Sequence, residues 1–151
     1  MYGYYKLLLP ESLIIKGSKS LSGKYPHDVP YNAVVVGNYL ICNAKYTAPE
    51  ITENSGKTLI NTAQGYAKCS VCAVGKNAVI TSDDGIYNAA KKYMDVLKIE
   101  PGYIRLNGVS YGFIGGATGL IAPDILAVNG DIKTHPDCGN ITAFCKNHRV
   151  D

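Results

Sequence analysis

Residues 69–99 read CSVCAVGKNAVITSDDGIYNAAKKYMDVLKI, and they set a pattern that recurs along the chain. Two short apolar runs flank a Gly-Lys-Asn turn at 75–77, which is typical of a β-hairpin. The polar residues 82–84 then predict the start of a helix. One apolar stripe at the helical period follows, made by Ile86, Ala89, Ala90, Tyr93, Met94 and Leu97. Residues 95–99 read as a closing strand, so the order is β-β-α-β.

An earlier copy of this order lies upstream. Residues 32–42 predict a hairpin with a Gly37-Asn38 turn, because Gly and Asn adopt the left-handed conformation at little cost. Pro49 fits the first turn of a helix that we expect to end near Asn54. Residues 57–61 then predict the closing strand.

A third copy lies downstream. It begins with a strand at 111–121, turns at Pro123, and continues as a strand at 125–129. After a loop, Asp137 is placed to cap a helix. Val150 reads as the first residue of the closing strand.

Two further segments read as extended, namely an orphan strand at Tyr4–Leu9 and residues 103–106 before an Asn107-Gly108 turn. The turns of the copies lie roughly 40 to 50 residues apart, which is typical of a repeat architecture. We therefore expect an α/β (α+β) fold with about three units in a single domain, residues 1–151. The pattern suits a segment of a longer ring, or a ring completed by a second copy through unpaired edge strands. The alternative is that three such units recur by coincidence.

Composition narrows the function classes. A hydrophobic fraction of 46% and a charged fraction of 18% exclude disorder as the main state. The net charge is +3 without a run of Lys or Arg, so we expect no nucleic-acid partner. Pro10-Glu11 directly follows the apolar run Leu7–Leu9, and no run approaches the ~20 residues that span a bilayer. These features predict a cytoplasmic protein without a membrane partner.

The five cysteines predict free thiols, since their number is odd and no secretion signal is read. Cys69 and Cys72 have C-x-x-C spacing, but no second such pair completes a zinc ribbon. On a strand, the two sulfurs would face opposite sides, one buried and one towards a site or the surface. We therefore expect neither a metal site nor a cofactor.

Several motifs in order resemble an uncharacterised bacterial family assigned to the guanidino-group-modifying, or pentein, superfamily. The motifs are Gln64–Ser70, Ile80–Ile86, Tyr111–Gly119, Asn129–Asp131 and His135–Asp137. Arginine deiminases, dimethylarginine hydrolases and amidinotransferases belong to this superfamily. The resemblance implies a pentein-like α/β propeller, of which this chain carries about three of five units. It implies no catalytic motif, because in the active enzymes the nucleophilic cysteine lies in a last unit that is not recognisable here.

The chain nevertheless has residues for cleaving a guanidinium C–N bond. Such chemistry needs a thiolate, a proton carrier and a carboxylate that holds the cation. We assign these roles to Cys69, His135 and Asp131, which occupy equivalent strand entrances and exits in the repeats. Substrate contacts are expected at three further positions, Asp28, Gly115 and Gly116.

Each candidate also has a structural interpretation. Asp84 and Asp137 suit helix caps, and Cys69 suits an inert buried thiol. The glycines of 112–119 lack the ending of a phosphate-binding loop and read as a strand that another backbone or a ligand approaches closely. Two hypotheses remain: a hydrolase or transferase acting on a guanidine- or amide-containing small molecule, or a non-catalytic binding or structural module. A pocket that brings Cys69, His135 and a carboxylate within hydrogen-bond reach would favour the enzyme.

Overall fold

The computed structural model describes residues 2–151 and contains three small sheets, each begun by an antiparallel hairpin. The first sheet has the order β1-β2-β3 and the second β4-β5-β6, and in both the third strand pairs in parallel with the second. The third sheet holds β7 and β8. The strands are β1 (Val34–Val36), β2 (Tyr39–Cys42), β3 (Thr58–Asn61), β4 (Cys72–Val74), β5 (Ala78–Thr81), β6 (Asp95–Lys98), β7 (Thr118–Ala122) and β8 (Ile125–Val128).

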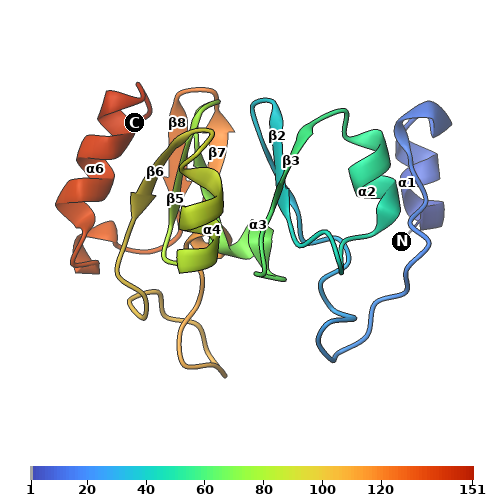
Figure 1. Ribbon diagram of the computed structural model, residues 1–151, viewed down its shortest axis with the longest axis horizontal. Helices are drawn as coiled ribbons and strands as arrows, with labels where there is room; N and C mark the ends of the chain where they lie inside the picture. The colour runs from blue at the N-terminus through green and yellow to red at the C-terminus, as the bar shows by residue number, and fades with distance from the viewer. Residues whose placement is uncertain (1) are drawn as a thin grey trace.

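A helix follows the hairpin of each unit. These helices are α2 (Pro49–Asn54), α4 (Asp84–Ala90) and α6 (Cys138–Asn147). Figure 1 shows the sheets side by side, with α6 and α2 towards opposite ends of the molecule. The mixed α/β class and the repeated β-β-α order are therefore as the sequence predicts.

Backbone hydrogen bonds repeat between the units. The amide of Thr58 donates to the Asn38 carbonyl at 2.9 Å, and that of Asp95 donates to the Asn77 carbonyl at 3.0 Å. In the third unit, the Asp151 amide donates to the Asp124 carbonyl at 2.8 Å, next to β8. The Asp151 carbonyl in turn accepts from the Leu126 amide at 2.7 Å. Asp151 directly follows Val150. Its amide therefore makes the same kind of bond as the amides of Thr58 and Asp95, the first residues of β3 and β6.

Two apolar clusters join the three sheets. Val79 of β5 packs in a cluster with Val36 and Ile41 of the first unit. Ile80, the next residue, packs in a second cluster with Ile141 of α6. Successive strand residues face opposite sides, so the middle sheet is covered on both faces.

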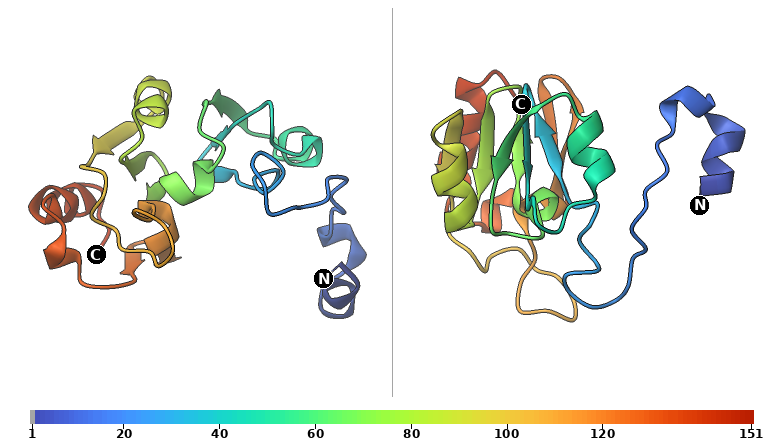
Figure 2. Two further views of the ribbon diagram at one scale, coloured as in Figure 1. Left: turned by 90° about the horizontal axis from the view of Figure 1, so that it is seen from below. Right: turned by 45° about the vertical axis from the view of Figure 1, so that its right-hand side comes forward.

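The N-terminal segment differs from the prediction. Residues 2–8 form helix α1 (Tyr2–Leu8), followed by a 3-10 turn η1 (Glu11–Leu13), and not an orphan strand at Tyr4–Leu9. Figure 2 (right) shows α1 and the segment after it standing away from the sheets. Tyr and Leu are tolerated in helices, and among residues 2–151 no strand pairs with this segment to favour an extended backbone. Because Tyr4–Leu9 forms no strand, this segment offers no strand edge for pairing with a second copy. Self-association through the edge strands of the sheets stays a prediction.

Two short helices replace expected strand. Cys69 lies in α3 (Ala67–Ser70), and the glycine-rich run contains α5 (Ile114–Ala117). Each helix leads into the first strand of its unit, β4 or β7. Asn107-Gly108 does form a turn, but residues 103–106 belong to no strand.

Helix α4 is shorter than its apolar stripe suggested. It ends at Ala90, so Tyr93 lies in the turn that follows, Met94 in a bend, and Leu97 in β6. Asp83 caps the helix through a 2.8 Å bond from the Ile86 amide to its Oδ1. Among residues 2–151, no helix is long and apolar enough to cross a membrane.

Candidate functional site

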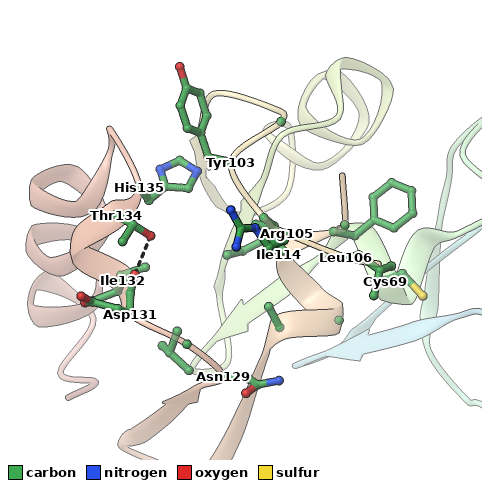
Figure 3. Close-up of a pocket in the computed structure, with 18 of the residues that line it drawn as sticks. Cys69, Tyr103, Arg105, Leu106, Ile114, Asn129, Asp131, Ile132, Thr134 and His135 are labelled. Atoms are coloured by element: carbon green, nitrogen blue, oxygen red, sulfur yellow. Dashed lines mark hydrogen bonds between the residues drawn. The ribbon is translucent and has the colours of Figure 1, made fainter. Parts of the chain in front are cut away.

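A pocket of about 920 Å³ opens between the second and third units (Figure 3). Its walls come from α3, from the segment between β6 and β7, and from the segment after β8. Polar lining residues include Cys69, Arg105, Asn129, Asp131, Thr134 and His135, and the apolar lining includes Tyr103, Leu106, Phe113 and Ile114.

The three residues with predicted catalytic roles all line this pocket, as does Gly116. Asp28 and Gly115 are not among the lining residues. Four of the six candidates, from segments far apart in the sequence, therefore line one pocket.

His135 is the most buried polar group of the pocket, with 5% of its surface exposed. The Asp137 amide donates to its Nδ1 at 3.0 Å, and the ring of Tyr103 lies with its centroid 5.5 Å away. The Nε2 atom is buried, and no hydrogen-bond partner is found for it among the described residues.

Asp131 is exposed and in part structural. Its Oδ1 accepts from the Lys133 amide at 3.0 Å, so the carboxylate caps the 3-10 turn η2 (Ile132–Thr134). Figure 3 shows its side chain turned away from Arg105. The residue lines the pocket, but its carboxylate is not aimed at the other predicted catalytic groups.

Cys69 is half-buried, and its Sγ accepts a hydrogen bond from the Asn32 side-chain amide at 3.2 Å. Figure 3 shows Cys69 and His135 on opposite sides of the pocket, with the sulfur pointing away from the imidazole. The two groups therefore share a pocket without forming a nucleophile–base pair in this structure.

Asp28 lies beside the pocket rather than in its wall. Its Oδ2 accepts a short hydrogen bond from the Tyr66 hydroxyl, and its buried Oδ1 has no partner among the described residues. The bond to Asp28 raises the pKa of Tyr66 to about 12, because it stabilises the protonated phenol. Tyr66 stacks on Phe113 with a centroid distance of 5.9 Å, and Phe113 lines the pocket. Tyr66 and Phe113 thus connect Asp28 to the pocket.

Gly115 serves packing. A Cβ there would lie 2.2 Å from the Val71 carbonyl oxygen and 2.4 Å from that of Lys68. The absence of a side chain lets α5 approach α3, so the predicted close approach of another backbone is confirmed. Gly116 differs, since nothing lies within 4 Å of a Cβ at its position.

Other predicted polar residues act in structure. Asp84 lies in the first turn of α4 and pairs with Lys98 at 2.6 Å, so its predicted capping role falls to Asp83. Asp137 occupies the N-cap position of α6, but its carboxylate accepts from the Glu100 amide at 2.8 Å and from Asn140 at 3.0 Å. The bond from Glu100 is the main reason that the pKa of Asp137 is lowered.

The thiols differ by burial. Burial raises the pKa of Cys72 to about 11, and it also raises the pKa of Cys42 and Cys145. Cys69 and Cys138 are half-buried. Of the two thiols in the C-x-x-C spacing, Cys72 is buried and Cys69 is half-buried in the pocket wall, and Cys69 lies in a helix rather than on the expected strand.

Several pocket residues were not singled out by the sequence analysis, and two of them carry polar or aromatic groups that bear on the site. Arg105 and Tyr103 lie in the segment between β6 and β7, where no motif marked them. Figure 3 shows the Arg105 side chain reaching towards the part of the pocket that holds His135. Within residues 2–151, no hydrogen bond or ion pair to Arg105 is found. Because Arg105 lies in a loop, no helical or strand periodicity in the sequence pointed to it.

Comparisons with known proteins give one match. The model of DUF6873, a family of unknown function, matches residues 2–151. Neither curated proteins nor solved structures give a match.

Over the part of the chain that the structure describes, no group of three or more His, Cys, Asp or Glu residues is placed to hold a metal ion.

Proposed function

The chain belongs to the DUF6873 family, and we propose that it binds a small molecule with an amide or guanidine group in the pocket between its second and third units. The observation that carries this proposal is that Cys69, Asp131 and His135 line the same pocket. Pockets with apolar walls and a few convergent polar groups are the usual sites of small ligands. The aromatic rings of Tyr103 and Phe113 offer flat surfaces for a planar group.

We further propose that the units belong to a pentein-like α/β propeller. The equivalent bonds at Thr58, Asp95 and Asp151 support a true structural repeat. The middle sheet packs on both neighbours, as a blade of a ring would. In such a ring, the loops at one end of the blades converge on a central site.

A hydrolase or transferase is the second candidate function. Its support is the half-buried thiol of Cys69 in the pocket wall, with the Asn32 amide donating to the sulfur. A thiolate there would attack the planar carbon, and the departing amine would take a proton from His135. The outward direction of the sulfur in Figure 3 favours binding without covalent chemistry.

Ligand titrations followed by amide NMR shifts would test the binding proposal, with butyramide and butylguanidinium as probes. Gly116→Leu places a side chain in the open space of the pocket, so probe binding should be lost. Gly139→Leu is the matched control, because Gly139 is also helical and unobstructed but does not line the pocket. Absence of binding by both probes, or equal binding by the two variants, would overturn the proposal.

The enzyme is tested separately by its products. Ammonia or amine release from either probe that disappears in Cys69→Ser would establish covalent catalysis. Probe binding without release would leave the binding function alone.

A further inference from the structure

One nitrogen of His135 is a hydrogen-bond donor whatever the charge of the ring. The Asp137 amide donates to Nδ1, so in the neutral imidazole the proton is on Nε2. In the imidazolium form Nε2 also carries a proton. The Nε2–H group therefore needs an acceptor.

The described residues supply none. Nε2 is buried without a partner, and the whole residue is only 5% exposed. A buried donor left unpaired costs about 1–3 kcal/mol, so native structures rarely keep one without a reason. Because His135 lines the pocket, an acceptor atom of the bound ligand is a direct remedy.

The neighbouring wall carries a cation that also has no partner among the described residues, although it is exposed. Arg105 lines the pocket, is exposed, and has no ion pair among the described residues. Figure 3 shows it directed towards the His135 part of the pocket, whereas the Asp131 side chain turns the other way. A guanidinium and a neutral or charged imidazole donor together favour an oxyanion.

We infer that Arg105 and His135 form a subsite for an oxyanion, either a carboxylate or a phosphate, on the ligand of this pocket. The inference rests on the proposed binding function and adds an anionic group to the ligand. Two donors with different geometry suit two oxygens of one group, since a guanidinium presents a planar fork. The ring of Tyr103 lies with its centroid 5.5 Å from that of His135 and is 56% exposed, so we expect it to shift as the oxyanion reaches the buried Nε2.

The subsite is tested with three probes: butyrate, its neutral isostere butyramide, and inorganic phosphate. Butyrate or phosphate should bind at least about tenfold more tightly than butyramide, the gain expected for charge-assisted hydrogen bonds. The bound oxyanion should shift the ¹⁵N resonance of His135 Nε2, with His27 and His148 as internal references. The tighter of the two anions identifies the source of the oxyanion.

Variants separate the donors from general charge. Arg105→Gln should abolish the preference for the anion, whereas Lys92→Gln removes the same charge from an exposed site outside the pocket and should not. His135→Gln keeps a donor and should retain more of the preference than His135→Phe. Equal affinity for the three probes, or no effect of Arg105→Gln, would overturn the subsite. If butyramide still binds and Gly116→Leu abolishes that binding, the proposed binding function stands even though the oxyanion subsite is rejected.

Discussion

The ammonium of Lys68 donates to the carbonyl oxygen of Gly115 at 3.0 Å, which ties α3 to α5. These short helices lead into the first strands of adjacent units, and both contribute to the pocket wall. The bond exists because Gly115 lets the two backbones approach closely. The pocket wall is therefore built on a unit-to-unit contact.

We expect Gly115→Ala to lower the free energy of unfolding by about 1–3 kcal/mol, since the new methyl group overlaps backbone atoms that cannot turn aside. Gly116→Ala is the control, and it should be neutral or stabilising by up to about 1 kcal/mol through better helix propensity. Urea denaturation measures both. Equal stability of the two variants would contradict the packing role of Gly115.

Limited alkylation with iodoacetamide should rank the five thiols by exposure and thiolate fraction. We expect Cys69 and Cys138 to label first, and Cys72 to label slowest because it is buried and its pKa is about 11. Mass spectrometry of the digested protein gives the order. Labelling of Cys69 as slow as that of Cys72 would remove the nucleophile of the enzyme hypothesis.

Replacing Asp28 should change the ionisation of Tyr66. Asp28→Asn removes the carboxylate that raises the pKa of Tyr66 to about 12, so this pKa should fall towards the usual value of about 10. Without the substitution, Tyr66 loses its phenolic proton from about pH 10 upwards in the unfolded chain. In the folded chain it keeps that proton until about pH 12. The hydrogen bond therefore stabilises the fold below pH 10, and its contribution is lost as the pH rises through this window.

The titration of Tyr66 can be followed by ¹³Cζ NMR, with the free energy of unfolding measured over the same pH range. Asp28→Asn should weaken the pH dependence of stability in that window. An unchanged midpoint for Tyr66 in the variant would show that another group raises its pKa.

The two acidic residues at the start of α4 should differ in their contribution to stability. Asp83→Ala removes the cap on the Ile86 amide and the 2.8 Å bond from Gln64, so we expect a loss of about 1–2 kcal/mol. Asp84→Ala breaks a pair in which Asp84 is 84% exposed, and should change stability by less than about 0.5 kcal/mol. Thermal unfolding compares the pair. A larger loss for Asp84→Ala would reverse the assignment of the cap.

The hairpins could be predicted because their signal is local. Gly37 and Gly75 both have positive φ, at 56° and 66°, which the turn sequences demand. The start of α4 was equally local, since Asp83 caps an amide three residues away. The prediction of a strand at Tyr4–Leu9 was wrong, because a short apolar run does not by itself distinguish a strand from a helix.

The pocket could be predicted only in part. The repeat placed Cys69, Asp131 and His135 at related ends of separate units, and all three line the pocket, although Cys69 does so from a helix. Their orientations did not follow, because the direction of the Cys69 sulfur depends on Asn32, a residue of another unit. Arg105 could not be found, since only the folded chain brings its loop to His135.

The three sheets share no strand, so their cooperativity depends on the two apolar clusters that meet at the middle sheet. Such a molecule approximates a nearest-neighbour array, in which each unit is stabilised chiefly by the one beside it. Truncating Val79 would weaken the link to the first unit, and truncating Ile80 the link to the third. Adjacent residues of one short strand thereby control whether the chain unfolds as one body or in separate steps.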